Sequence, residues 1–135
     1  MVKMEAVYQG DLHCQITHGP SGEIIFTDAP VDNQGKGESF SPTDLLGASL
    51  ASCIATTIAI YANRKGWDMK GMRVEVEKEM QSVPERKIRR LVVKVWIPLD
   101  LSEEDRVKVE RVAHTCPVHK SIDPSVDMPI TFEYA

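Results

Sequence analysis

The chain has 135 residues, of which 42% are hydrophobic and 27% are charged, a balance that fits one globular domain over residues 1–135 and excludes a disordered chain. Its formal net charge of -4 argues against general nucleic-acid binding, because affinity for a phosphate backbone depends on clustered positive charge. The first residues contain no apolar run of signal-peptide length, so we expect a cytoplasmic location. In that reducing compartment, a bond between two of the three cysteines would be transient and catalytic.

The N-terminal part of the chain predicts extended structure followed by a loop. From Val7 to Phe26 two strand-like runs flank Gly19-Pro20-Ser21-Gly22, which is a strong turn signal. Residues 28–40 contain one proline and two glycines and predict a loop.

A long helix should begin at Ser41 and end near Lys65. Ser41 provides a capping hydroxyl, Pro42 suits the first helical position, and Asp44 completes a capping-box variant at the positive end of the helix dipole. Gly66 directly after the expected last residue is a typical helix terminator.

The stretch from Leu45 to Ala62 contains no charged residue, and apolar side chains occur on every face of the expected helix. A bilayer span needs roughly 20 mostly apolar residues. Gly47, Ser52 and Thr56 dilute the run, so a helix buried all round inside a soluble protein is favoured over a membrane helix. One small sheet and one further helix cannot cover a helix of about 36 Å on all sides. We therefore expect a homodimer with a large apolar interface and no membrane partner.

The second half of the chain predicts two strands, a helix and a closing strand. Residues 72–80 alternate strictly between apolar and mostly charged side chains, and Leu91–Ile97 is a more buried run. The basic cluster at residues 86–90 lies between these runs and is expected at a solvated hairpin corner. Ser102 begins an amphipathic helix through a second capping box, and Ile130–Tyr134 should be a short closing strand. The mixture predicts an α+β fold.

The three cysteines differ in their local context. A mid-helix cysteine such as Cys53 usually packs as a small hydrophobe. Cys116 precedes Pro117, which suits the first position of a helical turn, so unpaired backbone N–H groups there are expected to lower the pKa of the Cys116 thiol. Cys14 lies in a probable strand and is interpreted as structural.

His114, Cys116 and His119 raise the alternative of a zinc site. Their HxCxxH spacing matches none of the stronger structural-zinc patterns, and the sequence offers no evident fourth ligand. We therefore expect no metal and interpret both histidines as helix-end or surface residues.

Two segments resemble motifs of the OsmC/organic-hydroperoxide-resistance (Ohr) family. SFSPTDLLGASLASCIATT is similar to the family's central-helix signature, in which a proline-led start is followed by a leucine pair and a cysteine. CPVHKSI is similar to the second-cysteine motif near the C-terminus. The order of elements matches over nearly the whole chain, so the chain resembles a divergent OsmC-like member.

This resemblance implies an α+β fold in an intertwined dimer, in which strands of both subunits enclose the long central helices. It also implies a thiol peroxidase that reduces small organic hydroperoxides in oxidative-stress defence. Cys53 would attack the peroxide and become a sulfenic acid. Cys116 would then form a disulfide with it, which an external thiol reductant reopens. No metal, haem or other cofactor is required.

The best-characterised peroxidase members of the family also use an N-terminal arginine held by a glutamate that follows the helix-starting proline. Here no arginine precedes Arg64, and Thr43 follows Pro42. The nearest substitutes are Lys36 and Glu38 in the loop before the helix, and Asp44 beside the expected position. We expect Lys36, held by Glu38 or Asp44, to take part of the arginine's role; His13, His18 and the helical turn at Cys116 are further candidates for stabilising a thiolate at Cys53.

An alternative from another functional class remains open. The chain would then be a non-enzymatic dimer that binds an apolar small ligand at its interface, with the cysteines as spectators. The geometry of the two cysteines separates these alternatives.

Overall fold

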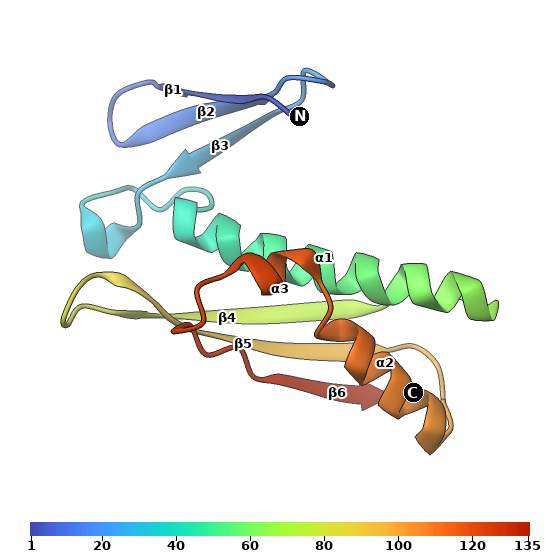
Figure 1. Cartoon of the computed structure of the whole chain (residues 1–135). Helices are drawn as coiled ribbons and strands as arrows, with labels where there is room; N and C mark the ends of the chain where they lie inside the picture. The colour runs from blue at the N-terminus through green and yellow to red at the C-terminus, as the bar shows by residue number, and fades with distance from the viewer. The chain divides into compact units, whose positions relative to one another are not determined.

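A computed structural model describes all 135 residues and contains three α-helices, a short 3-10 helix and six strands in two three-stranded sheets. This mixture of helices and mainly antiparallel strands confirms the predicted α+β class. The chain forms two compact units, Met1–Leu46 and Gly47–Ala135, which are coloured from blue to cyan and from green to red in Figure 1.

The first unit contains an antiparallel sheet in the order β1-β2-β3, formed by β1 (Met4–Tyr8), β2 (His13–His18) and β3 (Ile24–Asp28). The predicted turn at residues 19–22 is confirmed, with Gly22 at a positive φ of 76°. The extended structure begins at Met4, earlier than the predicted Val7. The 3-10 helix η1 (Val31–Asn33) lies in the loop that leads to α1.

Helix α1 (Pro42–Lys65) begins and ends as predicted. The Asp44 backbone N–H donates to Ser41 Oγ at 3.0 Å, and the Ser41 N–H donates to Asp44 Oδ2 at 3.0 Å, which is the reciprocal pattern of a capping box. Gly66 follows the last turn with a positive φ of 73°, a conformation that favours glycine.

In a single chain, a smaller part of the surface of α1 is buried than the sequence predicts. The fully buried positions recur every three or four residues and form one face: Gly47, Leu50, Ile54, Ile58 and Ala62. The opposite face remains open because a single sheet contacts a helix along one side only. By length and composition alone the helix could cross a bilayer, a test that core helices of soluble proteins also pass.

The second unit is a sheet covered by helices. β4 (Arg73–Gln81) pairs antiparallel with β5 (Lys87–Ile97), which pairs parallel with β6 (Ile130–Tyr134). The Gly47–Lys65 part of α1, α2 (Glu103–Ala113) and α3 (Pro117–Ser121) all lie on one face of this sheet (Figure 1). The buried side chains of β5, α1 and α2 meet between these layers and form the core of this unit.

The basic cluster at residues 86–90 lies only partly in the predicted hairpin corner, because only Arg86 falls between β4 and β5. Lys87, Arg89 and Arg90 lie within β5, because the strand begins at Lys87 and pairs with β4 from there. Arg89 Nη1 lies 3.4 Å from Glu79 Oε1, so part of the positive charge is neutralised by the neighbouring strand.

Candidate thiol site

Cys53 and Cys116 are placed by two helices of the second unit. Cys53 lies in the middle of α1 and is half-buried. Cys116 is the N-cap residue of α3, as Pro117 predicts, and its side chain is completely buried in the core. The predicted position of Cys116 at a helix start is therefore confirmed.

The fold brings these two cysteines together although 63 residues separate them in the sequence (116 - 53). Their side chains are hydrogen-bonded to each other. The bond favours the thiolate of Cys53 and the protonated thiol of Cys116, so the Cys116 S–H donates to the Cys53 sulfur. Both cysteines are free rather than joined by a disulfide.

The pKa of the Cys53 thiol is shifted in two opposing directions. Burial raises this pKa, but hydrogen bonds from the Cys116 thiol, the Val118 backbone N–H and the Thr57 hydroxyl together lower it below its ordinary value. The distance between Cys53 Sγ and Thr57 Oγ1 is 3.9 Å, which is long for a hydrogen bond to sulfur, so this bond is weak. The net effect is a cysteine that ionises more readily than a free thiol and is a better nucleophile at neutral pH.

The pKa of Cys116 is raised, which is opposite to the prediction from sequence. Burial raises it first, and the hydrogen bond to Cys53 raises it further because the Cys116 proton is used in that bond. The His119 backbone N–H donates to Cys116 Sγ at 3.4 Å and lowers the pKa only in part. The Val118 backbone N–H also lowers the pKa of Cys116 and is shared with Cys53, and the two backbone donors together do not offset the rise.

His114 and His119 flank Cys116 but do not extend the thiol site to a metal site. Their rings meet edge to face with centroids 5.6 Å apart. Burial lowers the pKa of His119, and the nearby charge of His114 lowers it further, so the ring favours its neutral form. No group of three or more histidine, cysteine or acidic side chains in the structure could hold a metal ion.

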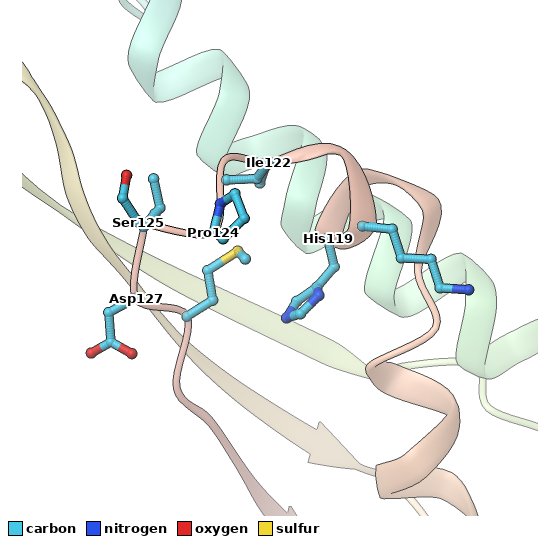
Figure 2. A pocket seen from close by; sticks show the side chains of 8 residues that line it. His119, Ile122, Pro124, Ser125 and Asp127 are labelled. Carbon is cyan, nitrogen blue, oxygen red and sulfur yellow. The ribbon is translucent and has the colours of Figure 1, made fainter.

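A cavity of about 480 Å³ lies beside α3 and is lined by the segment that follows it. Figure 2 shows His119 on one side of this cavity, with Ile122, Pro124, Ser125 and Asp127 on the other. Neither Cys53 nor Cys116 lines it. Neither sulfur therefore borders this cavity.

The remaining predicted residues belong to the first unit or to the start of α1. Lys36 and Glu38 are exposed in the loop before α1, and the Glu38 backbone N–H donates to Asp28 Oδ2 at 3.1 Å. Asp44 uses Oδ2 in the capping box. All three residues belong to the first unit, whereas Cys53 belongs to the second.

The two candidate histidines of the hairpin have their own partners. His13 Nδ1 lies 2.5 Å from Oδ1 of the nearly buried Asp28. His18 Nδ1 lies 2.6 Å from Ser21 Oγ. The helical turn at Cys116, which the sequence also suggested as a stabilising group, lies in the same unit as Cys53 and contacts it through Val118.

Sequence reasoning missed Thr57 and Val118 as neighbours of Cys53. Thr57 could have been found, because a residue four positions later on a helix lies next to Cys53 on the same face. Val118 could not, because it acts through its backbone N–H, which every residue except proline has.

Comparisons with known proteins identify the family and the fold of the chain. The family model described as OsmC-like protein matches residues 35–131. The crystal structure of a candidate osmotic stress induced and detoxification response protein from Psychrobacter arcticus is 41% identical, with a TM-score of 0.93 over 98% of this chain and 96% of that one. None of the curated proteins compared with the chain matches it.

Two more distant structures show the same fold. The organic hydroperoxide resistance protein OsmC from Legionella pneumophila is 18% identical, with a TM-score of 0.79 over 98% of this chain and 96% of that one. A candidate organic hydroperoxide resistance protein from Vibrio cholerae, with captopril bound in one of its active sites, is 16% identical, with a TM-score of 0.77 over 98% and 90% of the two chains. The matched family model spans most of the chain and includes both cysteines, and the chain therefore belongs to the family of OsmC-like proteins.

Proposed function

We propose that this protein is a thiol-dependent peroxidase that reduces organic hydroperoxides through Cys53 and Cys116. Family members named as organic hydroperoxide resistance proteins support a role in peroxide stress. The observation that carries the finer proposal is the hydrogen bond between the two thiols, which lowers the pKa of Cys53 and raises that of Cys116.

In the first step the Cys53 thiolate attacks the distal oxygen of the hydroperoxide. The O–O bond breaks, Cys53 becomes a sulfenic acid, and the alkoxide leaves and takes a proton to become an alcohol. This step needs a thiolate, and the bonds from Cys116, Val118 and Thr57 stabilise it.

In the second step Cys116 loses its proton and attacks the Cys53 sulfur. The S–O bond breaks, the hydroxide leaves as water after protonation, and a Cys53–Cys116 disulfide forms. Two external thiols then reduce this disulfide by exchange and are themselves oxidised to a disulfide. In the complete cycle one hydroperoxide and two thiols give one alcohol, one water and one disulfide.

We assign to Lys36 part of the role that an arginine has in better-characterised family members. Lys36 is an exposed cation. Glu38 follows it by two residues, and its backbone N–H is held by the carboxylate of Asp28. A positive charge near a thiolate lowers its pKa. An ammonium group should stabilise the thiolate less than a guanidinium group does, because it lacks the planar arrangement of several N–H donors. Glu38 would steady Lys36, whereas Asp44 would act mainly by capping α1.

We also propose that the protein forms a homodimer. The first unit leaves many large apolar side chains exposed: Met4, Val7, Tyr8, Leu12, Ile24, Ile25 and Phe26. On α1, Ile60 is 52% exposed on the side opposite the buried face. Apolar surface on this scale is typical of an interface. We also propose a cytoplasmic location, where small thiols are available to reopen the disulfide.

A free-thiol count before and after one equivalent of cumene hydroperoxide tests the function. Two of the three free thiols should disappear. The loss should be abolished in Cys53→Ser and unchanged in number in Cys14→Ser. In Cys116→Ser the peroxide should instead leave a sulfenic acid on Cys53, which dimedone traps. An unchanged thiol count in the wild-type protein would contradict the peroxidase and favour the ligand-binding alternative.

A further inference from the structure

We propose that the Cys53–Cys116 disulfide loosens α3, so that this short helix is ordered in the reduced protein and less ordered in the oxidised one. The inference rests on the proposed function, which forms the disulfide, and adds a conformational change that follows the redox state. Its basis is the set of hydrogen bonds that hold the first turn of α3.

The sulfurs of both cysteines accept hydrogen bonds from the beginning of α3. A helix starts with backbone N–H groups that have no partner inside the helix. The first residue of α3 is a proline, which has no N–H. The Val118 N–H donates to the Cys53 sulfur, and the His119 N–H donates to Cys116 Sγ at 3.4 Å. The N–H groups of the first turn therefore depend on sulfur atoms for their partners.

These bonds matter because α3 has only five residues. Helices shorter than about 12–15 residues are marginally stable on their own, since few internal bonds offset the cost of starting the helix. In α3 the Lys120 N–H donates to the Cys116 carbonyl at 3.1 Å, and Ser121 Oγ donates to the Pro117 carbonyl at 2.8 Å. With so few bonds of its own, the helix depends on the partners of its first N–H groups.

Disulfide formation weakens the bonds to both sulfurs. Because the pKa of Cys53 is lowered, the reduced pair favours a thiolate at Cys53, and hydrogen bonds to a charged acceptor are roughly twice as strong as neutral ones. Oxidation removes two electrons and the proton of Cys116, and the neutral sulfurs that remain are weak acceptors. The new covalent bond also draws Cys116 Sγ toward Cys53, which changes its position relative to the His119 N–H. Two N–H groups thus lose good partners, which costs free energy.

The loosened segment should end at Asp127. The Asp127 N–H donates to the Arg89 carbonyl at 3.1 Å, and the Asp127 carbonyl accepts from the Leu91 N–H at 2.9 Å, so the chain is held there to β5. The disulfide holds the other end at Cys116. Between these points lies His119, which forms one side of the cavity in Figure 2. We therefore expect the cavity to keep its shape in the reduced protein and to lose this side on oxidation.

A cross-link by itself predicts the opposite change. A disulfide restricts the chain that it joins and usually stabilises the structure around it. Loss of hydrogen-bond acceptors and the added cross-link therefore predict faster and slower local opening of α3, respectively. Amide hydrogen exchange measures such local opening and separates the two effects.

The experiment compares hydrogen exchange in the reduced protein and in the same protein oxidised with diamide, which accepts two electrons from the thiols without any peroxide. Peptide mapping identifies the disulfide, and mass spectrometry reads the amides of residues 118–121. We expect these amides to exchange roughly tenfold or more faster in the oxidised protein, while α2 exchanges equally in both forms. Unchanged or slower exchange at residues 118–121 would overturn the inference. It would also be overturned by an equal acceleration in α2, or by a protein in which diamide forms no Cys53–Cys116 bond.

Variants of the reduced protein test the hydrogen bonds without oxidation. Cys53→Ala removes the acceptor of the Val118 N–H, and Cys116→Ala removes the acceptor of the His119 N–H, so α3 should exchange faster in both. Cys116→Ser is the matched control and should keep slow exchange, because serine is a preferred N-cap residue. Equal exchange in Cys116→Ala and Cys116→Ser would overturn the role given to the Cys116 sulfur and with it the inference.

The outcome is separable from that of the proposed function. A protein that ignores cumene hydroperoxide but loosens α3 when diamide forms the disulfide would contradict the peroxidase and support this inference. A protein that consumes the peroxide through both cysteines and keeps α3 equally ordered in both redox states would support the peroxidase and overturn this inference.

Discussion

Two successive backbone N–H groups of α3 donate hydrogen bonds to the Cys53 and Cys116 sulfurs. The Val118 N–H donates to Cys53, and the His119 N–H donates to Cys116 at 3.4 Å. Cys116 in turn donates its own proton to Cys53. One short turn of chain therefore makes the two thiols chemically unequal: one is easily ionised and partly exposed, and the other is protonated and buried.

Replacing Cys116 should make Cys53 less reactive near neutral pH. Cys116→Ala removes a hydrogen-bond donor from the Cys53 thiolate, so the pKa of Cys53 rises and its alkylation rate at pH 7 falls several-fold. Cys116→Ser keeps a donor and should retain part of the effect. The rate of iodoacetamide alkylation against pH measures both variants. The alkylation rate should begin to rise at a lower pH in the wild-type protein than in either variant. Identical curves for the wild-type protein, Cys116→Ala and Cys116→Ser would contradict the donor role of Cys116.

Thr57 should have a smaller influence on the same titration. Thr57→Val keeps the shape of the side chain but removes the hydroxyl that lies 3.9 Å from Cys53 Sγ. The pKa of Cys53 should rise, by less than in Cys116→Ala, because the contact is long. Thr57→Ser, which keeps the hydroxyl, is the control. A larger shift in Thr57→Val than in Cys116→Ala would reverse the assigned order of the two donors.

Lys36→Met tests the cation proposed to assist Cys53. If Lys36 stabilises the thiolate, its removal shifts the alkylation curve of Cys53 to higher pH and slows the reaction with cumene hydroperoxide. Lys3→Met removes an equal charge from the exposed N-terminus and should change neither the alkylation curve nor the rate of reaction with cumene hydroperoxide. A Cys53 pKa that is the same in wild type and Lys36→Met would remove Lys36 from the site.

The open face of α1 should contact a second copy of the chain. Ile60→Asp would place an unpaired charge in that apolar interface, at a cost of several kcal/mol, and should dissociate the dimer. Val107→Asp on α2 is a matched control, because Val107 is 54% exposed and Ile60 is 52% exposed. Sedimentation at low micromolar concentration distinguishes the states. A well-folded wild-type monomer under these conditions would contradict the dimer.

Gly47→Ala should stabilise the protein. Gly47 lies inside α1, where glycine costs about 1 kcal/mol relative to alanine. An added Cβ would lie 3.5 Å from Leu91 Cδ2 and 3.6 Å from Val76 Cγ1, which is ordinary van der Waals contact. Urea denaturation should therefore show a higher free energy of unfolding. A loss of stability would show that the space beside Gly47 is needed by another group.

The sequence alone determined the helices, the strands and the class of fold. Capping residues such as Ser41 and Ser102 act within four residues of themselves, so their effect is visible in the local sequence. The alternation along β4 is equally local, and Glu75, Glu77 and Glu79 are exposed as predicted. The position of Cys116 at a helix start follows from Pro117 for the same reason.

Only the tertiary structure decided how the two cysteines divide their tasks. The local sequence around Cys116 favours a lowered pKa, yet burial and the proton shared with Cys53 raise it. Burial depends on which elements pack together, and the hydrogen bond joins residues that 63 positions separate. The Val118 amide likewise reaches Cys53 only because α3 packs beside α1. A sequence pattern cannot express these effects, because a pKa depends on the distance between groups in space and on their exclusion from water.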